Sequence, residues 1–189
     1  MKMLGVDGSG RTGGNTGALV RGFLEGAAAA GAETTFLELG PLTIRGCRAC
    51  KACKVDPKKV CVIEDDMQPF YELFPETDVL FLASPIYLDH ITAQLMAFIQ
   101  RTYCYLSPSL DNYWPRTGVR FVAGITYGAG DATMYDDVLD WMEARMKFYF
   151  AIPTVGKLKV PGCAHTDPIG ADHPEVRRAR ELGGALAGA

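Results

Sequence analysis

An alternation of short apolar runs and longer amphipathic stretches constrains the fold of this chain more than any other feature. Five of the runs are rich in apolar and β-branched residues and bounded by turn residues, as buried strands are. The expected strands are 3–6, 34–39, 79–83, 119–125 and 152–155. Strands that alternate with helices form a parallel sheet with helices on both faces. We therefore expect an α/β fold built on one doubly wound, five-stranded sheet.

Helical stretches separate the expected strands, because their apolar residues recur at a period close to 3.6. Three such groups are Leu19, Val20, Phe23, Leu24 and Ala27; Ile91, Leu95, Phe98 and Ile99; and Leu139, Met142 and Met146. A weaker last helix is expected from His173 to Leu186, because a proline and an acidic residue stand at its start. These apolar stripes are expected to be core faces.

Length and composition indicate one domain over residues 1–189, because no linker or charge run divides the chain. With 48% hydrophobic and 22% charged residues, the chain has enough apolar material for a substantial core. The net charge of −3 gives no electrostatic reason to expect nucleic acid or an anionic membrane as partner. Small molecules or other proteins are the expected partners.

The N-terminus enters the first expected strand without a signal-like apolar region, and no apolar run approaches the roughly 18 residues of a membrane span. We therefore expect a cytoplasmic protein. In that reducing compartment, the six cysteines are more readily explained by metal or redox chemistry than by disulfides.

A glycine-rich loop, residues 8–16, lies between the first expected strand and helix, where backbone N–H groups and the helix dipole attract an anion. Hydroxyl, amide and guanidinium groups add donors, and glycines let the backbone approach a phosphate closely. The loop is not a Walker motif, because no Gly-Lys-Ser/Thr follows. A plain turn with a helix cap is the alternative. The candidate phosphate-binding residues are Ser9, Arg11, Thr12, Gly14, Asn15 and Thr16.

Two further loops follow the third and fourth expected strands, at the sheet edge where open α/β folds bind ligands. Each offers a tyrosine, small residues and backbone polar groups, which suit a flat apolar ring with polar edges. Taken singly, Ser-Pro turns and helix caps explain them equally well. Together with the phosphate loop, they indicate flavin mononucleotide (FMN). The candidate ring-binding residues are Ser84, Pro85, Ile86, Tyr87, Tyr127, Gly128 and Gly130.

Four cysteines follow the second expected strand in the pattern C-x2-C-x2-C-x7-C: Cys47, Cys50, Cys53 and Cys61. Three thiolates at successive two-residue gaps can surround a compact cluster that a fourth ligand closes, whereas zinc sites usually pair two separated knuckles. We infer a single 4Fe-4S centre in a segment of about residues 46–66. Zinc ligation or idle thiols remain alternatives.

Lysines crowd the same segment at Lys51, Lys54, Lys58 and Lys59. Such a patch offsets thiolate charge and suits an acidic protein donor such as a ferredoxin, while a solvated lysine face is the alternative. Cys104 and Cys163 have no partner spacing and are expected to be ordinary residues, because free cysteine behaves as a small buried hydrophobic residue. No order of serine, histidine and aspartate indicates hydrolytic chemistry.

With these motifs in place, the chain resembles the iron-sulfur flavoproteins, a branch of the NAD(P)H-dependent FMN reductase-like, flavodoxin-fold superfamily. Residues 8–16 are similar to the family's Gly-Ser-Pro-Arg-x-x-Gly-Asn-Thr, with Gly10 in place of proline. Residues 61–67 resemble its C-x3-Asp-Asp-Met, and residues 84–87 lead into 92–99 as they do there. The resemblance implies a flavodoxin-like sheet of order 2-1-3-4-5. It also implies FMN phosphate on Ser9, Arg11, Asn15 and Thr16, the ring near residues 85–87 and 127–128, and a 4Fe-4S cluster on Cys47, Cys50, Cys53 and Cys61.

The chain departs from the family pattern at Leu88, Asp89 and His90, where relatives often have an aromatic or small residue and glycine. The departure falls on the surface beside the expected flavin ring, which bears on the substrate. The resemblance further implies a homodimer or homotetramer, in which a cluster after the outlying second strand serves a neighbour's flavin.

The leading functional hypothesis is electron transfer from a ferredoxin-like donor through the cluster to FMN and a small acceptor such as dioxygen, peroxide or a quinone. An NAD(P)H-dependent FMN or quinone reductase with auxiliary cysteines is the first alternative. A non-enzymatic carrier or sensor of FMN or metal is the second.

Overall fold

The computed structural model describes residues 1–55, 60–106, 117–163 and 168–189. Its strands are β1 (Lys2–Asp7), β2 (Glu33–Glu38), β3 (Val79–Tyr87), β4 (His90–Ile91), β5 (Arg120–Thr126) and β6 (Thr154–Val160). Its α-helices are α1 (Asn15–Ala29), α2 (Ala52–Val55), α3 (Phe70–Leu73), α4 (Ala93–Arg101), α5 (Asp136–Phe150) and α6 (Pro174–Ala187). Two short 3₁₀ helices, η1 (Phe74–Glu76) and η2 (Thr102–Tyr105), follow α3 and α4.

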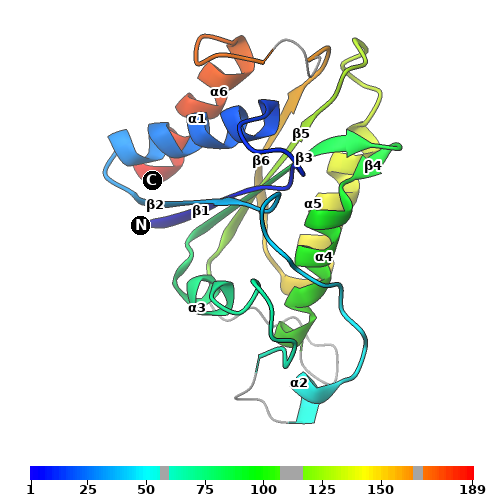
Figure 1. Cartoon of the computed structure of the whole chain (residues 1–189). Helices are drawn as coiled ribbons and strands as arrows, with labels where there is room; N and C mark the ends of the chain where they lie inside the picture. Colours follow the sequence, from blue (N-terminus) through cyan, green and yellow to red (C-terminus); the bar gives the residue numbers. More distant parts are fainter. Residues whose placement is uncertain (56–59, 107–116, 164–167) are drawn as a thin grey trace.

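The sheet has the strand order β2-β1-β3-β5-β6, and all neighbours in this path are parallel. This confirms the expected α/β fold and the 2-1-3-4-5 order of the five main strands. The additional strand β4 pairs antiparallel with the end of β3, so the two form a hairpin at the carboxyl end of this central strand (Figure 1). The sequence did not predict this hairpin.

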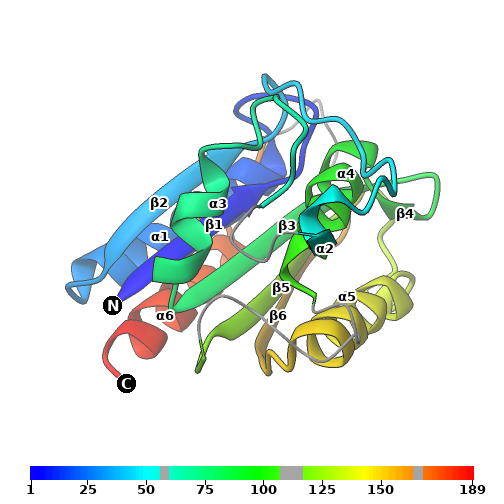
Figure 2. The same cartoon turned by 90° about the horizontal axis from the view of Figure 1, so that it is seen from below.

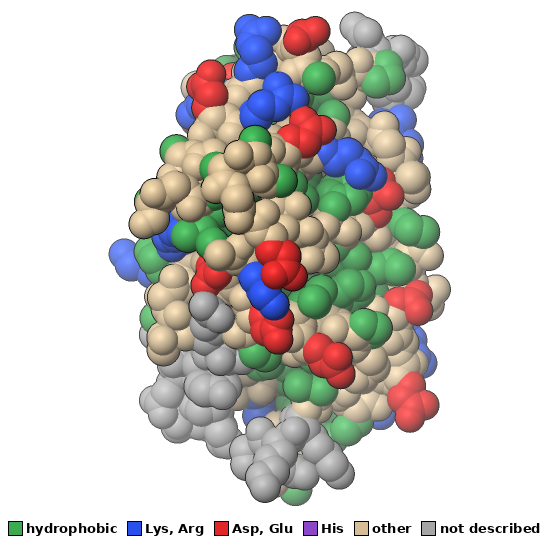
Figure 3. Space-filling view, turned by 90° about the vertical axis from the view of Figure 1, so that its left-hand side faces the viewer, with side chains coloured by type: hydrophobic (Ala, Val, Ile, Leu, Met, Phe, Trp, Pro, Cys, Tyr) green, Lys and Arg blue, Asp and Glu red, His purple; other side chains and the backbone are tan. Residues whose placement is uncertain are grey.

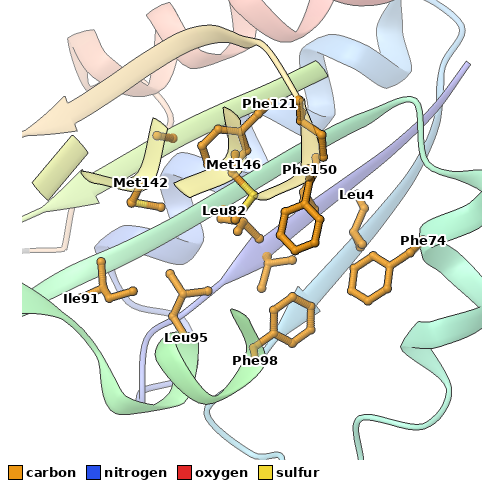
Figure 4. Close-up of a cluster of buried hydrophobic side chains, with 14 of the residues drawn as sticks. Leu4, Phe74, Leu82, Ile91, Leu95, Phe98, Phe121, Met142, Met146 and Phe150 are labelled. Carbon is orange, nitrogen blue, oxygen red and sulfur yellow. The ribbon is translucent and has the colours of Figure 1, made fainter. Parts of the chain in front are cut away.

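Helices cover both faces of the sheet, with α1 and α6 on one side and α4 and α5 on the other (Figures 1 and 2). Successive residues of β3 serve opposite faces because side chains alternate along a strand. Phe81 packs with the α1 and α6 side, whereas Leu80 and Leu82 pack with the α4 and α5 side. Figure 4 shows the second of these cores, where Leu95 and Phe98 meet Leu82 and Met146.

The two helices on the first face approach each other backbone to backbone. A Cβ atom built on Gly26 of α1 would collide with the carbonyl oxygen of Arg180, and one built on Gly183 of α6 would collide with that of Phe23. Glycine is therefore required at both positions for this close packing.

Two predicted boundaries were wrong. The predicted strand 152–155 is displaced, since β6 runs from Thr154 to Val160 with Leu158 and Val160 buried in alternation. The predicted helix beginning near Ile91 starts at Ala93 instead, with Thr92 as its N-cap. Ile91 is nevertheless buried, from β4.

The surface offers no dominant charge of either sign on the face drawn in Figure 3, where lysine, arginine and acidic side chains are interspersed with hydrophobic ones. Among the described residues, no helix is both long and apolar enough to cross a membrane.

Candidate functional site

A cavity of about 300 Å³ opens at the carboxyl ends of β1, β3 and β5, where the sequence placed the ligand. It brings together residues from the first loop and from both later loops. The predicted residues that line it are Ser9, Arg11, Asn15, Thr16, Pro85, Ile86, Tyr87, Tyr127 and Gly128, and they are joined by Thr126 and Cys163.

The phosphate loop (residues 8–16) presents a helix start that no side chain caps. Gly14 is the N-cap of α1, has extended backbone angles and carries no side chain to accept from the first-turn N–H groups. Ser9 is buried, and its Oγ accepts the backbone N–H of Arg11 at 3.0 Å. Donor groups around an uncapped helix N-terminus are the chemistry that a phosphate needs, so the residues present fit FMN.

Hydrogen bonds fix the loop to the rest of the molecule. Thr16 and Thr126 share a buried hydrogen bond of 2.8 Å between their hydroxyl oxygens. The Oδ1 atom of Asn15 accepts the backbone N–H of Ile169 at 3.0 Å, so this side chain also anchors the segment before α6. On the other side, the hydroxyl of Thr92 donates to the carbonyl oxygen of Gly8 at 2.6 Å. The cradle is therefore pre-formed.

A carboxyl group lies beneath the phosphate loop. Asp7 is fully buried, and its Oδ1 accepts the backbone N–H of Ser9 at 2.8 Å. Burial raises the pKa of Asp7 to about 6, even though the bond from Ser9 opposes the shift. The sequence analysis did not single out this residue.

The two ring-binding loops are joined through aromatic side chains. The hydroxyl of Tyr135 donates to Asp89 Oδ1 at 2.9 Å, and the ring of Tyr135 meets Tyr127 edge-on at a centroid distance of 5.0 Å. The bond to Asp89 is the main cause that raises the pKa of Tyr135. His90 packs edge-on against Trp141 of α5 at 4.8 Å. The β3–β4 hairpin is thus held against the loop after β5 and against α5.

The departure of this chain at residues 88–90 forms a tight turn. Leu88 and Asp89 both have left-handed backbone angles, with φ of 48° and 62°, between the paired residues Tyr87 and His90. Two such residues in sequence define the type of turn that suits a two-residue hairpin. The side chain of Leu88 is fully exposed.

Four predicted flavin-site residues are outside the described lining of the cavity: Thr12, Gly14, Ser84 and Gly130. Ser84 is buried, donates to the carbonyl oxygen of Pro85 at 2.8 Å and accepts the N–H of Thr92 at 3.0 Å. Its hydroxyl therefore stabilises the hairpin and the start of α4. Gly14 serves as the helix cap, and Thr12 is exposed.

Sequence reasoning missed Thr126 and Cys163. Thr126 is the last residue of β5, one position before the predicted ring-binding loop. Cys163 follows the true end of β6, where the Sγ atom donates to the carbonyl oxygen of Val160 at 3.3 Å. Placing the last strand at 154–160 would have brought Cys163 to the ligand edge, since parallel strands end at the same side.

The described parts of the cysteine segment (residues 46–66), which are 46–55 with helix α2 and 60–66, lie near the end of α4, at the bottom of Figure 1. Cys47 and Cys50 are exposed, and Cys53 and Cys61 are half-buried. Burial raises the pKa of Cys53, and repulsion from Cys61 and Cys47 adds to the shift. A hydrogen bond with the backbone of Ala52 is the main cause that lowers the pKa of Cys50. A hydrogen bond with the side chain of Arg48 adds to this shift.

The donor set of four thiols fits an iron-sulfur cluster by its chemistry. Within the described residues, however, no group of three or more ligating side chains is close enough to hold a metal ion. Ala49 and Lys51, on either side of Cys50, have φ of 53° and 58°, so both residues that flank this cysteine have left-handed backbone angles.

A buried arginine fixes the segment to the domain. Arg101 of α4 is 1% exposed, and its Nη1 is 2.6 Å from Asp65 Oδ2. The guanidinium also donates to the carbonyl oxygens of Arg45 at 2.9 Å and Ile63 at 3.2 Å. Burial of Asp65 opposes ionisation, but the bonds from Arg101 and the backbone outweigh it and hold its pKa below the usual value.

One lysine of the predicted patch makes internal hydrogen bonds instead of facing solvent. Lys54 donates to the carbonyl oxygens of Tyr103 at 2.6 Å, Cys104 at 3.3 Å and Leu106, and its Nζ lies over the Tyr103 ring. This lysine caps the end of η2 and joins the cysteine segment to it. Lys51 is exposed, while Lys58 and Lys59 lie outside the described residues.

Comparison with known proteins identifies the family, both by the length of chain that matches and by the sequence identity to relatives. The family model described as NADPH-dependent FMN reductase matches residues 1–153. An iron-sulfur flavoprotein of Methanosarcina thermophila is 31% identical over 144 residues, which are 75% of this chain and 73% of that protein. An iron-sulfur flavoprotein of Archaeoglobus fulgidus is 28% identical over 190 residues, which are 99% of this chain and 79% of that protein.

Solved structures show the same fold at low identity. The NAD(P)H:quinone oxidoreductase from Methanothermobacter marburgensis has a TM-score of 0.74 at 15% identity, over 98% of this chain and 96% of that one. A flavodoxin from the domain Archaea has a TM-score of 0.59 at 11% identity, over 99% and 96%. The fold is therefore flavodoxin-like, and the chain belongs to the iron-sulfur flavoproteins, a branch of the NADPH-dependent FMN reductase family.

Proposed function

We propose that this flavin-dependent oxidoreductase binds FMN in the cavity at the sheet edge, carries a 4Fe-4S cluster in its cysteine segment, and transfers electrons from a ferredoxin-like donor to a small acceptor. The uncapped N-terminus of α1 beside Ser9 and Arg11 carries the flavin part of the proposal, because it supplies donors for a phosphate. When bound, FMN accepts and donates one or two electrons, so it can join a one-electron donor to a two-electron acceptor.

The residues of the chain would bind and orient this cofactor. Ser9, Arg11, Asn15 and Thr16 line the cavity and would hold the phosphate, and residues 85–87 and 127–128, which also line it, would hold the ring. Tyr127 is buried, and its hydroxyl donates to the carbonyl oxygen of Asp131 at 3.2 Å, which fixes its ring beside the cavity. A fixed aromatic wall excludes water from one side of a flavin ring.

The cluster part of the proposal rests on the spacing of Cys47, Cys50, Cys53 and Cys61 and on the names of the relatives, which are iron-sulfur flavoproteins. Residue 61 leads directly into the turn that Arg101 holds through Asp65, so the predicted fourth ligand is on an anchored part of the segment. Cys47 and Cys50 are exposed, whereas Cys53 is half-buried, as Cys61 is.

A second candidate function is an NAD(P)H-dependent FMN or quinone reductase in which the cysteines are auxiliary. The family model that matches is that of NADPH-dependent FMN reductases. The protein of similar fold from Methanothermobacter marburgensis is an NAD(P)H:quinone oxidoreductase. NAD(P)H would then replace the protein donor. A carrier or sensor without turnover is the third candidate.

An anaerobic absorption spectrum of freshly purified protein, with iron, sulfide and flavin analysis, tests the proposal first. We expect FMN together with about four irons per chain, as one 4Fe-4S cluster requires. Cys61→Ser should abolish the cluster after reconstitution, whereas the control variant Cys163→Ser, whose thiol lines the flavin cavity instead, should retain it. FMN without iron, combined with steady oxidation of NAD(P)H, would replace the leading function by the second.

Assembly can be measured on the same preparation. From the family resemblance, we propose a homodimer or homotetramer, which sedimentation equilibrium would detect. A monomer at micromolar concentration would contradict this part of the proposal.

A further inference from the structure

Asp7 is an unusual residue to find under a phosphate site. Its side chain is fully buried, yet Oδ2 has no hydrogen-bond partner in the part of the chain that the structure describes. A Cβ atom built on Gly17 would lie 2.7 Å from this oxygen, so the carboxyl group fits closely against the first turn of α1. A buried carboxylate oxygen without a partner is costly to keep ionised.

The carboxyl group of Asp7 does not line the cavity itself but lies next to residues that do. Through Oδ1 it accepts the N–H of Ser9, and through Oδ2 it contacts Gly17, the residue after Thr16. Ser9 and Thr16 both line the cavity. A phosphate bound there would therefore place its negative charge close to the carboxylate, separated only by the loop backbone.

The charged groups around Asp7 do not neutralise it fully. Glu38, its register partner on β2, adds negative charge, and Arg21 on α1 adds positive charge but is 3.6 Å from Glu38, with which it pairs. The register partner on β3 is Ala83, which carries no charge. Glu38 also accepts the N–H of Gly13 at 3.2 Å, so a second carboxylate touches the phosphate loop.

We infer that Asp7 is a positioning residue of the phosphate loop that takes up a proton when the phosphate of FMN binds. Deprotonated Asp7 still orders the loop through Ser9, but it repels the incoming dianion. In its protonated form, the carbonyl-type oxygen keeps the bond from Ser9 and the repulsion disappears. The inference rests on the proposed FMN site and goes beyond it, because it assigns the loop a proton-linked affinity.

The sign of the effect follows from linkage. In the free protein the pKa of Asp7 is about 6, so the group is mostly ionised at pH 7.5. A nearby phosphate dianion raises this pKa further, because like charges disfavour ionisation. As pH rises from the free to the bound pKa of Asp7, the affinity for FMN should fall. The total fall should be up to about tenfold for each unit by which binding raises the pKa.

Isothermal titration of the apoprotein with FMN, in buffers of different ionisation enthalpy at pH 7.5, measures the proton uptake directly. Phosphate monoesters have a second pKa of about 6, so the ligand is already mostly dianionic at this pH. Riboflavin, which has the same ring and no phosphate, is the matched ligand control. We expect net proton uptake with FMN and none with riboflavin.

Asp7→Asn is the matched variant, since it keeps an oxygen for the Ser9 N–H and removes the charge. We expect it to bind FMN without proton uptake and to lose the fall in affinity between pH 6 and 8. If Asp7→Asn does not fold, Asp7→Ser serves the same purpose, and the comparison of FMN with riboflavin on the natural sequence needs no variant.

The outcomes separate the two proposals. FMN binding with equal proton uptake in the natural protein and in Asp7→Asn would overturn the role of Asp7 and leave the flavin site intact. Equal uptake with FMN and riboflavin would do the same. Failure of both ligands to bind would contradict the proposed function itself.

Discussion

At the scale of single residues, two charged residues are buried in the part of the chain that the structure describes, Asp7 and Arg101. Asp7 is under the phosphate loop, and Arg101 is under the cysteine segment. The two are handled differently. Arg101 has an ion pair with Asp65 and several carbonyl partners, whereas one oxygen of Asp7 has no hydrogen bond among the described residues. The first position favours permanent charge, and the second favours its loss.

Arg101→Met should destabilise the protein strongly. The Asp65 side chain is only 3% exposed, so removing the guanidinium leaves a buried carboxylate without its main partner, at a cost of about 3–5 kcal/mol. Urea unfolding at pH 7 would measure the loss. The double variant Arg101→Met with Asp65→Asn should recover part of it, and a full loss in the double variant would show that packing, not charge, is the cause.

The same pair predicts a pH dependence. Because the folded state holds the pKa of Asp65 below its ordinary value of 3.8, the stabilisation is present above that value and is lost as pH falls through the lower, folded pKa. In acid unfolding below pH 4, the natural protein should therefore show a steeper loss of stability than the Asp65→Asn variant. Parallel curves would contradict this assignment.

At the scale of elements, the β3–β4 hairpin carries strain in its turn. Leu88 has φ of 48°, a conformation that costs a residue with a Cβ atom about 1 kcal/mol, and its exposed side chain has no packing to lose. Leu88→Asn or Leu88→Gly should therefore raise the free energy of unfolding by about 0.5–1 kcal/mol. Thermal melts would detect this gain. Unchanged or lower stability would mean that Leu88 has packing in an assembled form.

The contact between α1 and α6 makes a second prediction about elements. Gly183→Ala should destabilise by about 1–3 kcal/mol, because the new Cβ would collide with the backbone at Phe23. Gly184→Ala is the matched control in the same helix, since its Cβ would be 3.4 Å from the Gly26 carbonyl oxygen. We expect this control to be neutral or slightly stabilising, because alanine favours helix. Equal losses in both variants would contradict the packing argument.

Elements also show how far sequence reasoning reached. The main strands and helices were predictable because their apolar periods are clear, as in β3 and α5. The β3–β4 hairpin was not, because its turn consists of Leu88 and Asp89 rather than the glycine or asparagine that usually mark such turns. The end of β6 was missed because Lys157 and Lys159 break the apolar run while Leu158 and Val160 remain buried.

The candidate site was predicted in part for the same physical reason. Residues at strand ends, such as Ser9 and Tyr127, follow from the rule that parallel strands present ligands at one edge. The inward or outward direction of a side chain in a loop does not follow from that rule. Ser84 and Lys54 were therefore expected to face a cofactor or partner, whereas both are used in internal hydrogen bonds.

At the scale of the whole molecule, cofactor binding should stabilise the folded protein. A ligand that binds only the native state adds about 2.7 kcal/mol at a hundredfold excess over its Kd. FMN should therefore raise the melting temperature in a concentration-dependent way, and riboflavin should do so less because it lacks the phosphate that the loop binds. An equal shift with riboflavin would argue against the phosphate role of residues 8–16.

A single helix, α4, connects the phosphate loop with the cysteine segment. The cap of α4 donates to Gly8 of the phosphate loop, and its last residue, Arg101, holds the cysteine segment (Figure 1). Nine residues of helix extend about 14 Å at 1.5 Å per residue. Helix α4 therefore sets the distance between the phosphate loop and the cysteine segment. Deleting one of its residues would shorten that distance by about 1.5 Å and rotate the far end of the helix by about 100°. The spacing between the phosphate loop and the cysteine segment is thus set by the length and phase of α4.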